Sequence, residues 1–403
     1  MELRISKGPT IYRAKYIFPV TDPPIENAAV LTKEGEILEC GPYEQVRKGF
    51  LGEEIDLGEV ALLPALVNAH AHIELSALKW RLTPSGSFVG WIKNLIRIRQ
   101  EISAEEYVSS ARQALKEAWQ NGIGLIGDHG NTGLSVPLLR ESPFLAVFFR
   151  EVIDFKGHTN LKDFLKENLS DPKITMSLAP HAPYTVSPIL MQAIKGWTQK
   201  YKLPFSLHVA ESQEEVEFLR FGRGPIKELL EERGQWPSNF VAPGLSPVHY
   251  LDRLNILDED TICVHLCQAT EDELALLAKK RAKPCLCLRS NTFLGVGLPK
   301  VEKMLDLGLK PCLGTDSLAS NDQLSIFAEM AAVRQFFPKI PAEVILKMAT
   351  LWGAKALKRN GVGFIGQGAR ADLLIIPTEK KDPKALLEEI VTKTPAQIGR
   401  LYG

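Results

Sequence analysis

Six of the eight histidines in this chain stand at or just after the ends of short apolar runs. They are His70, His72, His129, His181, His208 and His265. In an α/β barrel the carboxyl ends of the strands meet on one rim, and active sites form on that rim. A single histidine beside an apolar run is usually a hydrogen-bonded core residue. Six histidines at the same place in the repeat instead predict a shared site.

Four of the candidate residues have the chemistry of metal ligands. His70 and His72 form a His-x-His pair, and alternate residues of a strand project to the same side, so both imidazoles can reach one ion. His208 ends the fifth apolar run and Asp316, in LGTDS, ends the eighth. Three imidazoles and one carboxylate suit Zn(II), with Fe(II) or another divalent ion as alternatives, and leave a position open for water. We therefore predict a catalytic site with one divalent metal ion.

Two further residues are candidates for proton transfer. Glu211 follows His208 by three residues in HVAE, where its carboxylate can lean over a metal-activated water and carry a proton. The glutamates that come next, in SQEEVEF, are typical of a solvated helix surface. His265 ends the sixth run, where its imidazole can hydrogen-bond the attacking oxygen or the oxyanion that forms. We predict that Glu211 and His265 are catalytic.

These residues need a scaffold of alternating strands and helices. From about Val60, apolar runs of four to eight residues alternate with longer segments of helical period, as in a parallel sheet. The eight runs are ALLPALVNAH, IGLIGDH, LAVFFREVI, ITMSLAPH, PFSLHVAE, TICVHLC, KPCLCLRS and KPCLGTDS. No glycine-rich nucleotide loop follows the first run. We therefore predict an α/β fold with a (β/α)8 TIM-type barrel over residues 61–358.

The two ends of the chain are β-like. Residues 1–60 contain segments such as TIYRAKYIF and AAVLTKEGEILECG, separated by turn signals. Near the other end, the run GVGFIGQGARADLLIIP is again typical of a strand. We predict that residues 1–60 and 359–403 together form a small, discontinuous β-sandwich.

The composition restricts the class of protein. Lys plus Arg and Asp plus Glu each number 48, so no net charge draws the surface to nucleic acid or to anionic lipid. The N-terminus lacks the apolar core of a secretory signal, and no apolar run is long enough to span a membrane. The six cysteines have no zinc-ribbon spacing. We expect a cytoplasmic protein that acts on a small molecule, without nucleic-acid or membrane partners, and a homodimer is one open possibility.

Several segments taken together resemble the amidohydrolase superfamily, in its cytosine-deaminase-like branch of triazine hydrolases and adenosylhomocysteine deaminases. The segments are LLPALVNAHAH, SLAPHAPYTVS, LHVAES, VHLCQAT, RSN and GTDSLASN. The resemblance implies a barrel with a β-sandwich and metal ligands at the four residues named above. It implies acid/base roles for Glu211 and His265, a proton-accepting role for Asp316 and a substrate contact for His181. Pro64-Ala65 departs from the Pro-Gly of many relatives. No lysine ends the fourth strand, where a carbamylated lysine bridges two ions in related enzymes, which favours one ion.

Within this branch, the segments NAHAHIELS, GSFVGWI and RSNTFLGVG most resemble the aminodeoxyfutalosine deaminases of menaquinone biosynthesis. Further candidate substrate contacts are Glu74, Trp91, Arg150, Glu151 and Asn291. Lys79 or Arg81 can pair with the carboxylate of such a substrate, or the loop that carries them can simply cap the barrel. Likewise, His129 can support the site or merely pack beneath it.

The function that we predict is hydrolytic deamination of an aminopurine nucleoside, with aminodeoxyfutalosine converted to futalosine and ammonia. Activated water would attack C6 of the adenine ring while Glu211 protonates N1. The alternatives in the same site are deamination of adenosylhomocysteine, methylthioadenosine, adenosine, guanine, cytosine or a pterin, and dechlorination of a triazine. A metal-binding protein without activity is disfavoured, because every ligand and the acid/base carboxylate are present.

Overall fold

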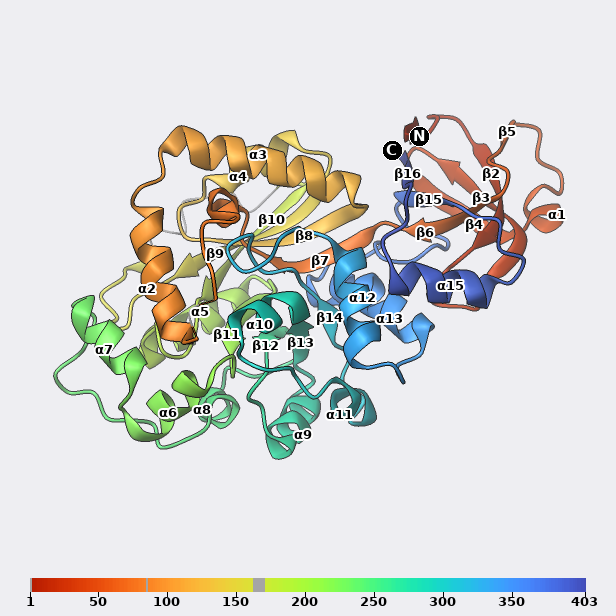
Figure 1. Ribbon diagram of the computed structural model, residues 1–403. Coiled ribbons are helices and arrows are strands. Elements are labelled where there is room, and N and C mark those ends of the chain that lie inside the picture. Colours follow the sequence, from red (N-terminus) through yellow and green to blue (C-terminus); the bar gives the residue numbers. More distant parts are fainter. Residues whose placement is uncertain (1, 85, 162–170) are drawn as a thin grey trace. The chain divides into compact units, whose positions relative to one another are not determined.

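The structure is a computed structural model of the 403-residue chain, and it describes residues 2–84, 86–161 and 171–403 (Figure 1). The chain divides into two compact units. The first unit comprises residues 1–68, 118–125 and 325–403, and the second comprises residues 69–117 and 126–324. Among the described helices, none is both long enough and apolar enough to cross a membrane.

An eight-stranded sheet formed by both ends of the chain is the centre of the first unit. The main path of the sheet runs β1-β16-β15-β6-β2-β3-β4, and β5 pairs with β2. The strands are β1 (Glu2–Arg4), β2 (Thr10–Ile17), β3 (Ile25–Lys33), β4 (Glu36–Pro42), β5 (Glu53–Asp56), β6 (Val60–Pro64), β15 (Leu373–Pro377) and β16 (Gly399–Tyr402). β1 pairs parallel with β16, and β15 pairs antiparallel with β6. The two ends of the chain therefore complete one sheet.

Helices complete the first unit. They are α1 (Tyr43–Val46), α12 (Ile326–Phe336), α13 (Ala342–Ala349), α14 (Leu351–Ala356) and α15 (Pro383–Thr392). α12 and α13 contact α15, and the first unit includes residues 325–358 as well as the terminal sheet. We predicted a β-sandwich formed by residues 1–60 and 359–403 alone. That sandwich stays a prediction.

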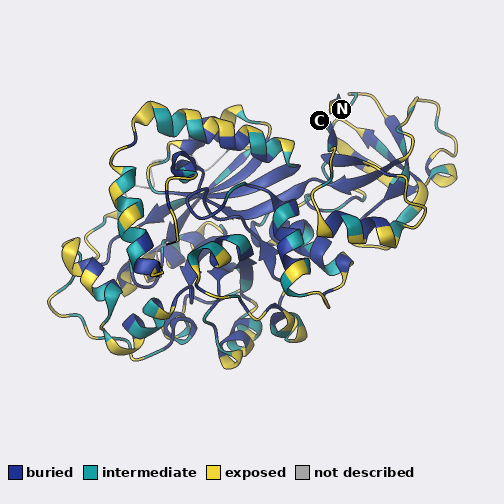
Figure 2. Cartoon of the chain, in the orientation of Figure 1, coloured by how far each residue is buried: buried dark blue, intermediate teal, exposed yellow. Residues whose placement is uncertain are grey.

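Two four-stranded sheets carry the second unit, in the orders β10-β9-β8-β7 and β11-β12-β13-β14. The strands are β7 (Leu66–Ala71), β8 (Ile123–Gly130), β9 (Leu145–Val152), β10 (Ile174–Pro180), β11 (Phe205–Val209), β12 (Thr261–His265), β13 (Lys283–Leu286) and β14 (Cys312–Leu313). β9 pairs parallel with β10, and the strands of the second sheet pair parallel throughout. Each of the eight predicted apolar runs overlaps one of these strands, and almost every residue of the strands is buried (Figure 2).

Backbone contacts join the two sheets at both seams. The His208 N–H donates to the His181 carbonyl oxygen over 2.9 Å, which ties β11 to the residue that follows β10. The N–H groups of Thr315 and Asp316 both donate to the His70 carbonyl oxygen, and Ala71 forms a parallel bridge with Asp316. Candidate site residues therefore lie at both seams.

Helices follow the strands of the second unit. They are the 3₁₀ helix η1 (Ile73–Leu78), α2 (Phe88–Arg99), α3 (Ala104–Gln120), α4 (Ser135–Glu141), α5 (Pro188–Lys200), α6 (Gln213–Phe221), α7 (Pro225–Glu232), α8 (Pro247–Arg253), α9 (Glu271–Lys280), α10 (Leu288–Leu294) and α11 (Val301–Asp306). Several begin at a serine whose hydroxyl accepts an orphan backbone N–H: Ser87 caps α2 in this way and Ser212 caps α6. Capping fixes where the loop ends and the helix begins, and so positions the loop residues around the site.

Candidate active site

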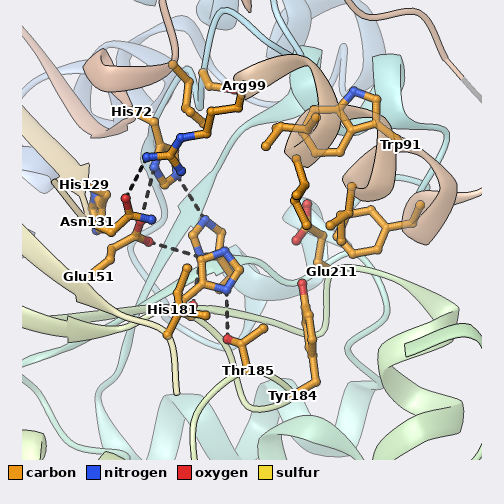
Figure 3. A pocket seen from close by; sticks show the side chains of 18 of the residues that line it. His72, Trp91, Arg99, His129, Asn131, Glu151, His181, Tyr184, Thr185 and Glu211 are labelled. Carbon is orange, nitrogen blue, oxygen red and sulfur yellow. Dashed lines mark hydrogen bonds and ion pairs between the residues drawn. The ribbon is translucent and has the colours of Figure 1, made fainter. Parts of the chain in front are cut away.

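A cavity of about 650 Å³ in the second unit brings most of the predicted site residues together (Figure 3). The predicted residues that line it are His72, Glu74, Trp91, His129, Glu151, His181, His208, Glu211, His265 and Asp316. His70 is fully buried behind them, with its ring 4.8 Å from the rings of both His72 and His208. Arg150 and Asn291 are not among the lining residues. The spacing of the apolar runs therefore predicted the centre of the site better than its periphery.

The four predicted metal ligands lie close together, and three of them, His70, His72 and Asp316, have donor atoms within 4.8 Å of one another. The Nε2 atoms of His72 and His208 lie 3.3 Å apart. Asp316 Oδ1 lies 3.6 Å from His72 Nε2 and 3.9 Å from His70 Nε2. Tetrahedral zinc with bonds of about 2.0–2.1 Å requires ligand atoms roughly 3.3–3.4 Å apart. The donor types suit a divalent ion, and the spacing brings His72 close to both His208 and Asp316, with His70 beside them.

Neighbouring groups determine which nitrogen of each imidazole is free to bind metal. His208 Nδ1 donates to the His181 carbonyl oxygen over 2.8 Å, and His72 Nδ1 lies 3.5 Å from Glu151 Oε2. A proton on Nδ1 leaves the lone pair on Nε2, the atom that faces the proposed ion. Burial lowers the pKa of both histidines, which keeps them in the neutral form that a metal requires.

The carboxylate of Asp316 is oriented by two hydroxyl groups. Ser290 Oγ donates to Oδ2 over 2.6 Å, and Ser320 Oγ donates to the same atom over 3.0 Å. Oδ1 is then the atom that faces the histidines. Ser290 lies in RSN and Ser320 in ASN, two segments that mark the family resemblance but that we did not assign a role. Ser290 and Ser320 lie 26 and 4 residues from Asp316 in the chain, and only the folded structure shows that both contact its carboxylate.

Glu211 and His265 form a buried pair beside the ligand cluster. Glu211 Oε1 lies 3.5 Å from His265 Nε2, and His265 Nδ1 donates to Asn291 Oδ1 over 2.7 Å. Burial, reinforced by the charge of Asp316, raises the pKa of Glu211 well above its usual range, and burial lowers the pKa of His265. Both shifts favour a proton on Glu211 and a neutral His265. Such a carboxyl group can give and retake a proton.

A second buried carboxyl group holds the turn that carries Glu211. Glu215 Oε2 accepts the backbone N–H of Glu211 over 2.8 Å, and Oε1 accepts that of Ala210 over 3.0 Å. Ala210 has a left-handed backbone, with φ of 53°, a conformation that costs energy for a residue with a side chain. Glu215 therefore stabilises an unfavourable turn at the site. We assigned the glutamates after Glu211 to the helix surface, but Glu215 is fully buried.

Backbone strain also marks the ends of β12 and β14. His265 has φ of 75° and Asp316 has φ of 59°. Few residues other than glycine adopt this region, and those that do cluster at functional sites. In this fold the left-handed residues turn the chain where a catalytic side chain must point into the cavity.

The remaining predicted contacts divide into lining and supporting residues. His181 lines the cavity and hydrogen-bonds Thr185 Oγ1 through Nδ1 over 2.9 Å. The Glu74 carboxylate accepts the backbone N–H groups of Thr132 and Gly133, the latter over 2.6 Å, so it holds the loop after β8. His129 is buried, hydrogen-bonds Ser206 Oγ over 2.9 Å and stacks on Phe149. Its contacts are those of a supporting residue that also reaches the cavity wall.

The loop after β7 differs from our expectation. Lys79 pairs with Glu117 at 3.5 Å and Arg81 pairs with Glu106, and neither cation lines the cavity. Both acids lie on α3, so the loop is tied to that helix. Trp80 is 76% exposed and cannot stack on a ligand in the cavity. The idea that Lys79 or Arg81 reaches the substrate is therefore wrong for this structure, and Arg99 and Arg233 line the cavity instead.

Comparison with known proteins agrees with this arrangement. Residues 61–397 match the model of the amidohydrolase family. The chain belongs to this family. As an amidohydrolase with relatives that are deaminases, it is a hydrolase of carbon–nitrogen bonds, and the resemblance seen in the sequence is confirmed.

Several proteins similar to this amidohydrolase are named as deaminases. An aminodeoxyfutalosine deaminase of Deinococcus radiodurans is 26% identical over 339 residues, 79% of this chain and 78% of the relative. A 5-methylthioadenosine/S-adenosylhomocysteine deaminase of Halalkalibacterium halodurans is 30% identical over 365 residues, covering 83% and 76%. The crystal structure of Helicobacter pylori aminofutalosine deaminase with methylthio-coformycin has a TM-score of 0.85 at 26% identity and covers 96% of this chain and 97% of that one. These similarities imply a TIM-barrel-type fold and support a purine nucleoside deaminase.

Proposed function

We propose that this amidohydrolase is a metal-dependent deaminase of adenine nucleosides and that its substrate is aminodeoxyfutalosine, which it converts to futalosine and ammonia in menaquinone biosynthesis. One observation carries the proposal: the buried Glu211 carboxyl group, beside His265, lines the same cavity as the candidate metal ligands His72, His208 and Asp316. A relative and a structural neighbour that act on this type of nucleoside support the choice of substrate.

The ligands of the proposed ion are His70, His72, His208 and Asp316, and we propose a single zinc ion. Three of the distances between their donor atoms are 3.3–3.9 Å, which supports one shared ion, and a water molecule would take a further position on it. When bound, a divalent ion lowers the pKa of a water molecule so that it can act as a nucleophile near neutral pH.

The residues of this chain then move the protons. Asp316 accepts a proton from the attacking water. Glu211 donates its proton to N1 of the adenine ring as C6 becomes tetrahedral. Asp316 returns the water proton to the amino group, which leaves as ammonia, and Glu211 takes up the proton of the C6 hydroxyl group as the carbonyl group forms. His265 Nε2 accepts a hydrogen bond from the attacking water or from the hydroxyl group on C6, since the Nδ1–H donates to Asn291. Burial of Glu211 supports this role, because it raises the pKa of the carboxyl group well above its usual range.

Other lining residues bind the nucleoside in this proposal. His181, Glu151 and Trp91 are the proposed direct contacts, because all three line the cavity. Glu74 acts through the loop after β8 that it holds. Asn291 acts through His265. We also predicted a contact for Arg150, which does not line the cavity.

The proposal includes a closed (β/α)8 barrel over residues 61–358, which the backbone bonds at the two seams support. It also includes a cytoplasmic location. A homodimer stays a prediction.

Ammonia release tests the proposal. Metal-replete protein is assayed with aminodeoxyfutalosine, adenosine, 5′-deoxyadenosine, methylthioadenosine, adenosylhomocysteine, guanine and cytosine. We expect deamination of adenine nucleosides, with kcat/KM for aminodeoxyfutalosine at least about 10-fold above that for adenosine. Preference for adenosylhomocysteine would contradict the substrate but not the nucleoside deaminase. Activity on cytosine or guanine alone would contradict both.

A further inference from the structure

One face of α2 forms a wall of the cavity. Residues at positions 88, 91, 92, 95, 96 and 99 recur with helical spacing and share one side of a helix. They are Phe88, Trp91, Ile92, Leu95, Ile96 and Arg99, and all six line the cavity. With a rise of 1.5 Å per residue, the apolar strip from Trp91 to Arg99 is roughly 12 Å long. The strip ends in a guanidinium group.

Neutral partners hold Arg99 in place. Its Nη2 donates to Asn131 Oδ1 over 2.8 Å, and the Tyr107 hydroxyl donates to its backbone carbonyl over 3.2 Å. Asn131 belongs to the loop after β8, whose backbone N–H groups donate hydrogen bonds to the Glu74 carboxylate. Figure 3 shows Arg99 and Asn131 together on one side of the cavity, with Trp91 on the other side. The hydrogen bond to Asn131 therefore fixes the orientation of the Arg99 guanidinium group.

Arg99 has no carboxylate partner among the described residues. Within those ranges no carboxylate oxygen lies within 4.0 Å of its nitrogens. The nearby acids have closer partners: Glu151 lies 3.5 Å from His72 and feels the charge of Arg99 only from beyond ion-pair distance, and Glu74 accepts two backbone N–H groups. By contrast, Arg97 on the same helix pairs with Glu101 at 2.8 Å. A partly buried guanidinium group in a cavity has a strong preference for an oxyanion.

We infer that Arg99 is the residue that selects the substrate within this class, by binding a carboxylate at the end of an apolar arm on the 5′ side of the nucleoside. This inference rests on the proposed nucleoside deaminase. The apolar strip separates the cation from the Trp91 end of the wall, so the arm is apolar and only its end is charged. A 5′-phosphate places charge next to the ribose, where the strip offers only hydrocarbon.

The experiment compares an acid with its neutral counterpart. The substrates are aminodeoxyfutalosine and its primary carboxamide, with adenosine 5′-monophosphate as the phosphate probe. For the wild-type enzyme we expect kcat/KM for the acid to exceed that for the carboxamide by roughly 10- to 100-fold, the scale of a hydrogen bond to a charged group. Arg99→Met should remove most of this preference, mainly through KM, and change kcat/KM for the carboxamide less than about threefold.

Matched variants make the result specific. Arg97→Met removes a cation from the opposite face of α2 and should leave the acid-to-amide ratio unchanged. Arg99→Lys keeps the charge but loses the planar fork, so it should restore part of the ratio. If Arg99→Met does not fold, the wild-type ratio and Arg99→Lys still test the inference. Calorimetric binding of the deaminated acid gives a readout independent of turnover.

Three results would overturn the inference while leaving the deaminase standing. They are equal kcat/KM for acid and carboxamide, an unchanged ratio in Arg99→Met, and faster turnover of the 5′-phosphate than of the carboxylate. Loss of the preference in Arg233→Met but not in Arg99→Met would assign the carboxylate to the other cavity arginine. Failure of the wild-type enzyme to release ammonia from any adenine nucleoside would instead contradict the proposed function.

Discussion

His72 Nε2 and His208 Nε2 lie 3.3 Å apart, although the two residues are separated by 136 positions in the chain. The Nδ1 atom of each ring faces an oxygen, so neither Nε2 needs to carry a proton. Two lone pairs at this separation repel each other unless a cation or a proton lies between them. The two histidines are therefore spaced so that a divalent ion could lie between them and remove this repulsion.

The first prediction concerns metal content. Purified protein should carry about one divalent ion per chain by elemental analysis, and chelation should abolish ammonia release and lower Tm, because a ligand that binds only the folded state stabilises it. His70→Ala or Asp316→Ala should lose both ion and turnover. Two tightly bound ions, or full activity after exhaustive chelation, would contradict the mononuclear site.

The second prediction concerns Glu211. Glu211→Gln keeps the size of the side chain but removes the proton carrier, so kcat should fall by about 100-fold or more while the ion stays bound. Glu217→Gln on α6 is the control, since its partner Arg223 lies on the surface, and it should retain activity. Loss of the ion in Glu211→Gln, with normal turnover of the remaining holoenzyme, would make Glu211 a ligand instead.

The third prediction concerns pH and Glu215. Burial raises the pKa of Glu215 from 4.5 to about 8, so the folded chain binds an extra proton between these pH values. The free energy of unfolding of the wild type should therefore fall as pH rises through this window, by up to ~1.4 kcal/mol per pH unit.

Glu215→Gln cannot lose a proton, so its free energy of unfolding relative to that of the wild type should rise between pH 5 and pH 8. Urea unfolding at each pH measures the difference, with Glu217→Gln again as the control. A difference that is constant with pH would show that Glu215 titrates normally.

The fourth prediction concerns the loop after β7. Lys79→Ala and Arg81→Ala should each change kcat/KM for aminodeoxyfutalosine and for its carboxamide less than about twofold, because both cations pair with acids on α3 outside the cavity. Their free energies of unfolding should fall by less than about 1 kcal/mol, the usual scale for exposed ion pairs. A large fall in kcat/KM for aminodeoxyfutalosine, but not for its carboxamide, in either variant would show that this loop contacts the carboxylate of the substrate.

The sequence by itself indicated the strands of the second unit and that the four candidate ligand residues lie near one another. Both follow from local patterns: apolar runs of strand length mark the buried strands, and His-x-His on one strand must project to one side. The family resemblance followed from the order of these short motifs along the chain.

Only the tertiary structure decided which charged side chains are available to a ligand. Arg81 and Arg99 look alike in the sequence, but Arg81 pairs with Glu106, while Arg99 donates to the neutral side chain of Asn131, 32 residues away. Glu215 looks like its exposed neighbours until the turn at Ala210 places two backbone N–H groups against its carboxylate. Local periodicity sets the direction of a side chain, but its charge partners come from distant segments, and the fold alone brings these together.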